Sequence, residues 1–118
     1  MADTVLAALQ RATEGLLYPS ETDAPFEAFV WQPGDNSEAT VRRLAGEPAK
    51  QTCRRESLAD FLQDLAEEAE FKQLQATLEK NLSGIQVYRF GSTDPTYYVV
   101  GSDDAGRLAG VRTKAVET

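Results

Sequence analysis

The stretch "TYYVVGSDDAGRLAGVRTKAV" (residues 96–116) decides the fold that the sequence predicts. Two runs rich in β-branched and aromatic residues flank the segment "DDAG" (103–106), whose residue types tolerate positive φ. This pattern predicts an antiparallel hairpin. Adjacent side chains of a strand point to opposite faces, so at most one of Tyr97 and Tyr98 can serve any single surface.

The segments before this hairpin carry one further strand and three helical patterns. "IQVYRFG" (85–91) predicts a third strand, which precedes the hairpin. Apolar residues recur at helical spacing in residues 5–16, 58–65 and 71–82, and each of these segments predicts a helix. Ser57 with Asp60 resembles a capping arrangement at the start of the middle helix.

Two more strands are expected between the first and second helices. Residues 26–31 are apolar enough to form a strand, and "ATVRRLAG" (39–46) is interpreted as the strand that returns from it. A short strand around Cys53 is also considered. A sheet of this composition needs helices to cover its apolar residues, so we predict one α+β domain over residues 1–118.

Charge and composition exclude several classes of function. The chain has a net charge of −7 and contains no histidine, which excludes Ser-His-Asp and Cys-His catalysis and imidazole metal ligation. An acidic surface repels nucleic acid and anionic membranes and attracts basic proteins. The alternative is that the acidity only maintains solubility. The apolar runs are too short to span a bilayer, and "MADTVLAAL" (1–9) lacks the basic start and long apolar run of a secretory signal. We therefore expect a cytoplasmic protein.

Several residues have both a functional and a structural interpretation. Cys53 lies beside two arginines, which favour a reactive thiol, but it can equally be an incidental cysteine. Trp31 can belong to the core or anchor an interface. The turn residues Asp94, Asp103 and Asp104 could bind Ca²⁺, although their spacing does not match an EF-hand loop and favours a solvated turn.

Two short segments gather carboxylate and hydroxyl oxygens. These are "SETD" (20–23) and "AVET" (115–118). Oxygen clusters of this kind can replace water around a hard cation such as Mg²⁺. Each can also be ordinary surface polarity.

Three stretches together resemble the nuclease A inhibitor family: "GLLYPSETDAPFEAFVW" (15–31), "NLSGIQVYRFG" (81–91) and "YYVVGSDDAGRLAGVRTKAVET" (97–118). The resemblance implies a three-layer α-β-α sandwich with a central, largely antiparallel sheet. It also implies that the protein binds and blocks a nonspecific Mg²⁺-dependent DNA/RNA endonuclease. Such nucleases have a basic groove with Mg²⁺ at its floor, and the inhibitor plugs this groove.

The resemblance assigns two contact positions, Glu21 and Thr118, and implies that Thr118 approaches the Mg²⁺ of the target enzyme. We expect Ser20, Thr22, Asp23 and Glu117 to support this contact. No catalytic residue, cofactor, membrane contact or direct nucleic-acid contact is expected, and a monomer is the expected state. The anionic tip would stand in for the phosphate of the substrate.

Two alternatives remain open. The connection "KQTCRRESLADFLQDLAEEAE" (50–70) is shorter than the family pattern and has no recognisable acidic, tryptophan-bearing loop. The protein can therefore be an acidic interaction module of the same fold that binds a different basic partner. The other alternative is an enzyme with a carboxylate site, which requires a cleft that gathers two or more acidic groups.

Overall fold

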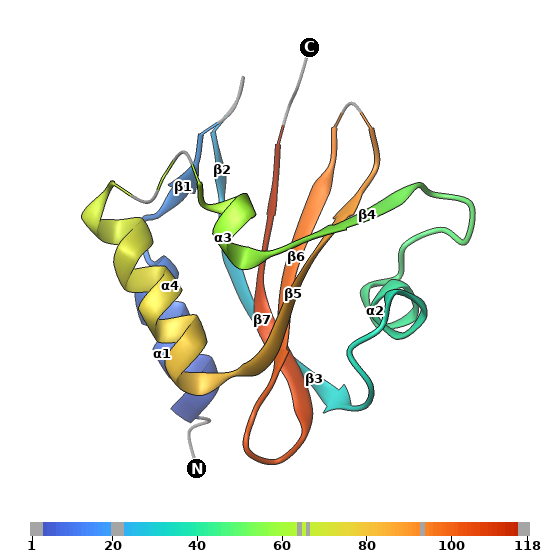
Figure 1. Cartoon of the computed structure of the whole chain (residues 1–118), viewed down its shortest axis with the longest axis horizontal. Coiled ribbons are helices and arrows are strands. Elements are labelled where there is room, and N and C mark those ends of the chain that lie inside the picture. Colours follow the sequence, from blue (N-terminus) through green and yellow to red (C-terminus); the bar gives the residue numbers. More distant parts are fainter. Residues whose placement is uncertain (1–3, 20–22, 64, 66, 93, 116–118) are drawn as a thin grey trace.

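The central element is a five-stranded antiparallel sheet with the strand order β3-β7-β6-β5-β4, accompanied by a separate β1-β2 pair (Figure 1). The computed structural model describes residues 4–19, 23–63, 65, 67–92 and 94–115. The strands are β1 (Leu17–Tyr18), β2 (Ala24–Pro25), β3 (Glu27–Pro33), β4 (Cys53–Glu56), β5 (Ser83–Phe90), β6 (Thr96–Ser102) and β7 (Arg107–Lys114). The helices are α1 (Thr4–Thr13), α2 (Glu38–Ala45), α3 (Leu58–Phe61) and α4 (Ala69–Asn81). The α+β class is therefore confirmed.

The β6–β7 hairpin forms as the sequence predicts. Its turn is organised by Asp103, whose Oδ1 accepts hydrogen bonds from the backbone N–H groups of Ala105 and Arg107, each at 2.9 Å. The Arg107 guanidinium pairs with Oδ2 of the same carboxylate at 2.7 Å. Gly106 adopts a φ of 79°, which side chains disfavour and which glycine allows. Both carboxylate oxygens of Asp103 accept hydrogen bonds within the turn, so this residue is not available as a Ca²⁺ ligand.

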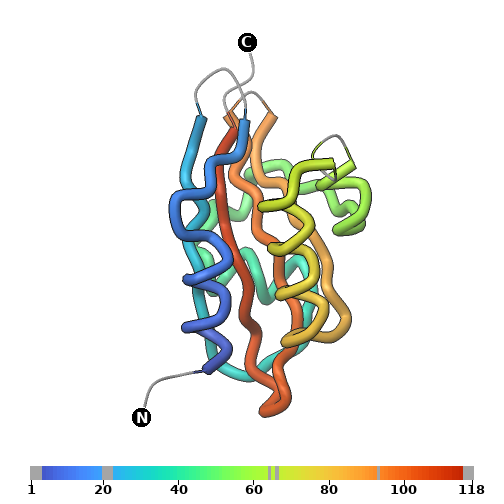
Figure 2. The backbone as a smooth tube through the Cα atoms, turned by 90° about the vertical axis from the view of Figure 1, so that its left-hand side faces the viewer, coloured from blue at the N-terminus to red at the C-terminus, as the bar shows by residue number. Residues whose placement is uncertain are grey.

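The two faces of the sheet support separate apolar clusters. Helices α1 and α4 lie side by side on one face, and α2 lies on the other (Figures 1 and 2). Tyr97 belongs to the cluster on the α1 and α4 side, whereas Tyr98 belongs to the cluster that contains Val41 of α2. The two tyrosines therefore point to opposite faces, as predicted. Burial on both faces fixes the register of the strands, since a shift of one residue would exchange the two faces.

Helices α1 and α4 confirm the periodicity of the sequence. In α1, Leu9 is fully buried, and the Thr13 hydroxyl closes the last turn by donating to the Leu9 carbonyl at 2.8 Å. In α4, the buried residues Phe71, Leu74 and Leu78 occupy one stripe at helical spacing. These two helices pack against each other and supply most of the helical side of the larger cluster.

The prediction of a returning strand at residues 39–46 is wrong, because this segment forms α2. Ser37 caps the helix by accepting a hydrogen bond from the Thr40 N–H at 3.3 Å. Gly46 ends it at a φ of 75°, with its N–H directed at the last carbonyls. Thr40 and Val41 are buried one turn before Leu44 and Ala45, which gives the helix one inward face.

The region after α2 agrees with the sequence only in part. The short strand around Cys53 is confirmed as β4, which pairs with β5. Ser57 caps α3 by accepting a hydrogen bond from the Asp60 N–H at 3.0 Å, as predicted. However, α3 ends at Phe61 instead of continuing to residue 65. Within the described residues, no helix is both long and apolar enough to cross a membrane.

Candidate functional site

Most of the predicted contact residues lie outside the described part of the chain. Ser20, Glu21, Thr22, Glu117 and Thr118 are not among the described residues. Asp23 is described, and it is exposed directly before β2. The site is therefore built from the described residues that flank the two segments.

Those flanking residues meet at one end of the sheet, the end at which β6 begins and β7 finishes, which we call the β7 end. Here the Thr113 hydroxyl of β7 donates to the Pro25 carbonyl of β2 at 3.1 Å. The Ala115 N–H donates to the Pro95 carbonyl at 3.0 Å. The residues on the carboxyl side of segment 20–22 and on the amino side of segment 116–118 thus lie side by side (Figures 1 and 2).

Strands β1 and β2 form an antiparallel pair, with Tyr18 opposite Ala24. The connection between these strands therefore starts and ends at the β7 end. Tyr18 anchors the pair, because its ring stacks on Phe61 of α3 at a centroid distance of 5.3 Å. It also contacts the rings of Phe26 and Tyr97 at 6.1 and 5.6 Å. Aromatic packing on the core thus fixes the base of the connection that carries Glu21.

A cleft of about 390 Å³ opens at the β7 end on the α2 side of the sheet. We call it the Glu27–Glu47 cleft, after the two carboxylates that line it together with Thr96, Tyr98, Arg112 and Lys114. Arg112 Nε donates to Oε2 of Glu27 at 2.8 Å, and the adjacent Nη2 contacts the same oxygen. This bond raises the pKa of Arg112, so the guanidinium stays charged.

The Glu47 side of the cleft is joined to the sheet by Tyr98. The Tyr98 hydroxyl donates to Oε1 of Glu47 at 3.3 Å. Burial, together with the nearby charge of Glu47, raises the pKa of Tyr98, so the phenol remains protonated. An enzyme with a carboxylate site would require a cleft that gathers two or more acidic groups. This cleft meets that requirement, because Glu27 and Glu47 both line it. One of them, Glu27, is already neutralised by Arg112.

Cys53 and Trp31 are both partly buried and pack against the cluster on the α2 side. Burial raises the pKa of the Cys53 thiol to about 11, so little reactive thiolate exists near neutral pH. This contradicts the reactive-thiol interpretation. Trp31 is half-buried and stacks on Phe29 at a centroid distance of 4.1 Å, against the cluster on the α2 side. In the described part of the chain, no group of three or more His, Cys, Asp or Glu residues could hold a metal ion.

Sequence reasoning missed the Glu27–Glu47 cleft entirely. Glu27 and Arg112 are 85 residues apart, and only the β3–β7 register places them opposite each other. Strand alternation could indicate that Arg112 and Lys114 share one face, and the register of the β6–β7 hairpin adds Tyr98 to it. No signal in the sequence indicates that Glu47 joins them.

These features define an α+β domain that brings the described flanks of two polar chain segments and a charged cleft to one end, an arrangement suited to binding a partner. A family model described as nuclease A inhibitor-like protein matches residues 3–118, nearly the whole chain. The chain therefore belongs to the nuclease A inhibitor-like family, as the resemblance predicted. Among curated proteins, none matches the chain. Membership in an inhibitor family implies a nuclease as the protein partner and is consistent with a non-enzymatic role.

Proposed function

We propose that this protein inhibits a nonspecific Mg²⁺-dependent DNA/RNA endonuclease by covering its active site with the β7 end. The observation that carries the proposal is the Thr113–Pro25 hydrogen bond, which joins the described flanks of the two predicted contact segments. Family membership supplies the inhibitor role. In the proposal, Glu21 and Thr118 make the principal contacts, and Ser20, Thr22, Asp23 and Glu117 surround them.

The proposed mechanism is substitution for the phosphate of the substrate. Oxygen atoms of Thr118 would approach the Mg²⁺ of the nuclease, displace its bound water and occupy the place of the scissile phosphate. The carboxylate of Glu21 would pair with a basic group of the substrate groove. Strand β7 is paired with β6 up to Lys114, so the chain that leads to Thr118 is held in place at Lys114. Less conformational entropy is then lost when the protein binds the nuclease.

Charge and architecture complete the proposal. A net charge of −7 favours a fast encounter with a basic groove, and this attraction weakens as salt increases. We further propose that the helices on the two faces make the domain a three-layer α-β-α sandwich. The protein would act as a cytoplasmic monomer without a cofactor of its own.

An inhibition assay against a panel of nonspecific Mg²⁺-dependent nucleases tests this function. Each nuclease is titrated with the protein on DNA and on RNA, and the cleavage rate is measured at several substrate concentrations. Competitive inhibition of at least one nuclease, on both substrates, is the expected result. Inhibition that excess substrate does not relieve would contradict active-site binding, and inhibition of none would contradict the proposed target class.

One observation favours a second candidate, an acidic module that binds a different basic protein. Residues 53–61 form β4 and α3, and the single tryptophan of the chain is Trp31 on β3. An acidic, tryptophan-bearing loop therefore does not occupy that connection. Affinity capture from the native host separates the two candidates. Recovery of a nuclease supports the first, and recovery of only other basic proteins supports the second.

A further inference from the structure

The Glu27–Glu47 cleft is continuous with the proposed contact surface. Its wall includes Ala24 and Pro25, which directly follow the segment that contains Glu21 and Asp23. Its rim includes Lys114, the last residue of β7. A protein that covers the β7 end would therefore also cover the mouth of this cleft. Its volume of about 390 Å³ can hold one large side chain, since pockets for small molecules begin near about 300 Å³.

Both carboxylates of the cleft keep acceptor positions that no described residue uses. Both bonds from Arg112 end on Oε2 of Glu27, so within the described residues Oε1 accepts no hydrogen bond. The Glu47 carboxylate accepts one long bond, from Tyr98, and forms no ion pair with any described residue. The guanidinium of Arg112 is meanwhile neutralised by Glu27. A cationic ligand can therefore bond to carboxylate oxygens of both Glu27 and Glu47.

We propose that the cleft receives an arginine side chain of the partner protein, with Glu47 as its principal acceptor. This inference rests on the proposed function, because it places a basic partner over the β7 end. A guanidinium carries five donors in a planar fork and so suits a site with several free carboxylate oxygens. The Thr96 hydroxyl on the same wall provides a further acceptor.

Replacement of Lys114 can show whether the side chain that enters the cleft is cationic or anionic. It is exposed at the rim and would repel a cationic side chain, whereas it would attract an anionic one. Removal of Glu47 and removal of Lys114 should therefore affect a cationic occupant in opposite directions. An anionic occupant would reverse both signs.

The first test uses a small probe and needs no nuclease. The full protein, labelled with ¹⁵N, is titrated with N-acetyl-arginine methylamide, and backbone amide shifts are followed by NMR. The matched control ligand is N-acetyl-citrulline methylamide, which has a similar shape without the charge. Saturable shifts at Glu47, Tyr98 and Arg112 with the arginine probe alone are expected, and Glu47→Gln should remove them. Absence of saturable shifts, or equal shifts with citrulline, would overturn the proposal.

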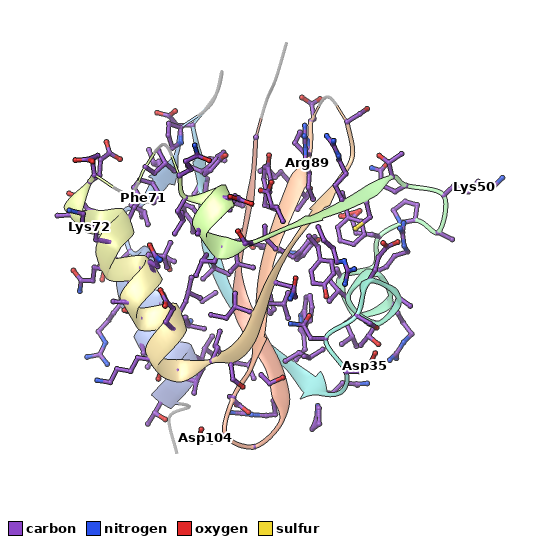
Figure 3. All side chains as sticks on the ribbon, in the orientation of Figure 1. Asp35, Lys50, Phe71, Lys72, Arg89 and Asp104 are labelled. Carbon is purple, nitrogen blue, oxygen red and sulfur yellow. The ribbon has the colours of Figure 1, made fainter. Side chains whose placement is uncertain are left out.

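The second test measures the affinity for a nuclease that the protein inhibits. Glu47→Gln should weaken binding about three- to tenfold, the scale of a partly exposed charged pair. Lys114→Gln should strengthen binding. Asp104→Asn is the control, because Asp104 is exposed at the opposite end of the molecule (Figure 3) and its removal changes the net charge equally. Unchanged binding in Glu47→Gln, or weaker binding in Lys114→Gln, would refute an arginine in the cleft.

The two tests separate this inference from the proposed function. If the arginine probe binds at Glu47 but no nuclease is inhibited, the cleft assignment stands and the proposed function fails. If a nuclease is inhibited with equal strength by the wild type and by Glu47→Gln, the proposed function stands and the cleft assignment fails.

Discussion

Thr113 and Pro25 are joined by a hydrogen bond of 3.1 Å that spans 88 residues of sequence. Thr113 is only 3% exposed, and its hydroxyl also lies 3.5 Å from the Ala24 carbonyl. Strand β2 and the last part of β7 are therefore held in a fixed relation. A contact surface composed of the segments that follow β7 and precede β2 depends on this relation.

Replacement of Thr113 by valine should loosen the β7 end while preserving its shape. Valine keeps the β-branched volume but cannot donate to the Pro25 carbonyl, so the free energy of unfolding should fall by about 1 kcal/mol. Urea unfolding measures this change. Thr113→Ser is the control, since it keeps the hydroxyl. If valine proves as stable as threonine, the hydrogen bond contributes nothing to the folded state.

Deletion of Thr118 should weaken inhibition strongly and leave the fold intact. If its oxygens approach the metal of the nuclease, the deletion should cost about 2 kcal/mol or more of binding free energy, the scale of an interface hot spot. Competition assays give the inhibition constant, and thermal unfolding checks the fold. Thr118→Ser keeps the hydroxyl and should inhibit nearly as well as the wild type. Equal inhibition by the deleted protein would exclude the plug mechanism.

Glu21→Ala should weaken inhibition in a salt-dependent manner. An electrostatic contact is screened by ions, so the loss of affinity should be larger at low salt than at high salt. Glu79→Ala is the control, because Glu79 is exposed in the last turn of α4, which leads into the end of β5 that pairs with Ser102, away from the β7 end. An equal loss for Glu21→Ala at both salt concentrations would show that Glu21 does not act through its charge.

The Asp103 carboxylate should make stability depend on pH. Burial alone would raise its pKa, but hydrogen bonds from the Arg107 and Ala105 N–H groups and from the Arg107 guanidinium lower it below 3.8. The unfolded chain therefore binds this proton more readily than the folded one. The stabilising contribution is fully present above about pH 4, and it is lost as pH falls through the folded-state pKa.

The corresponding variant is Asp103→Asn, measured by urea unfolding from neutral to acidic pH. It should be less stable than the wild type near neutral pH, and the difference should shrink as the solution becomes acidic. Asp104→Asn, which removes the exposed neighbouring charge, should show no such convergence. A stability difference that is constant over the whole pH range would mean that ionisation of Asp103 is not its source.

The sequence was most informative where local signals and tertiary packing agree. The β6–β7 hairpin carries strand-forming runs and a suitable turn, and α4 carries a long apolar stripe. Both formed as predicted. The error at residues 39–46 arose because β-branched Thr40 and Val41 favour a strand locally. The capping serine Ser37 and the glycine Gly46 were the signals that indicate a helix.

The candidate site was less predictable, for a physical reason. The family resemblance named Glu21 and Thr118, but only the pairing of β3 with β7 brings the adjacent β2 beside β7. The Glu27–Arg112 pair depends on the register of strands far apart in sequence. Glu47 lies just after α2, the segment that the sequence was interpreted to form as the returning strand of a hairpin. Local sequence patterns do not indicate which distant residues tertiary contacts will bring together.

The position of the β6–β7 turn has a practical consequence. Asp104 projects from the end of the domain opposite to the β7 end (Figure 3). A fluorophore or a surface tether attached there through Asp104→Cys would leave the β7 end, the proposed contact surface, accessible. Maleimide chemistry near neutral pH would select this new thiol, because burial keeps Cys53 protonated. The β6–β7 turn is therefore a suitable attachment site for immobilisation and single-molecule measurements, and its use requires no change in the core.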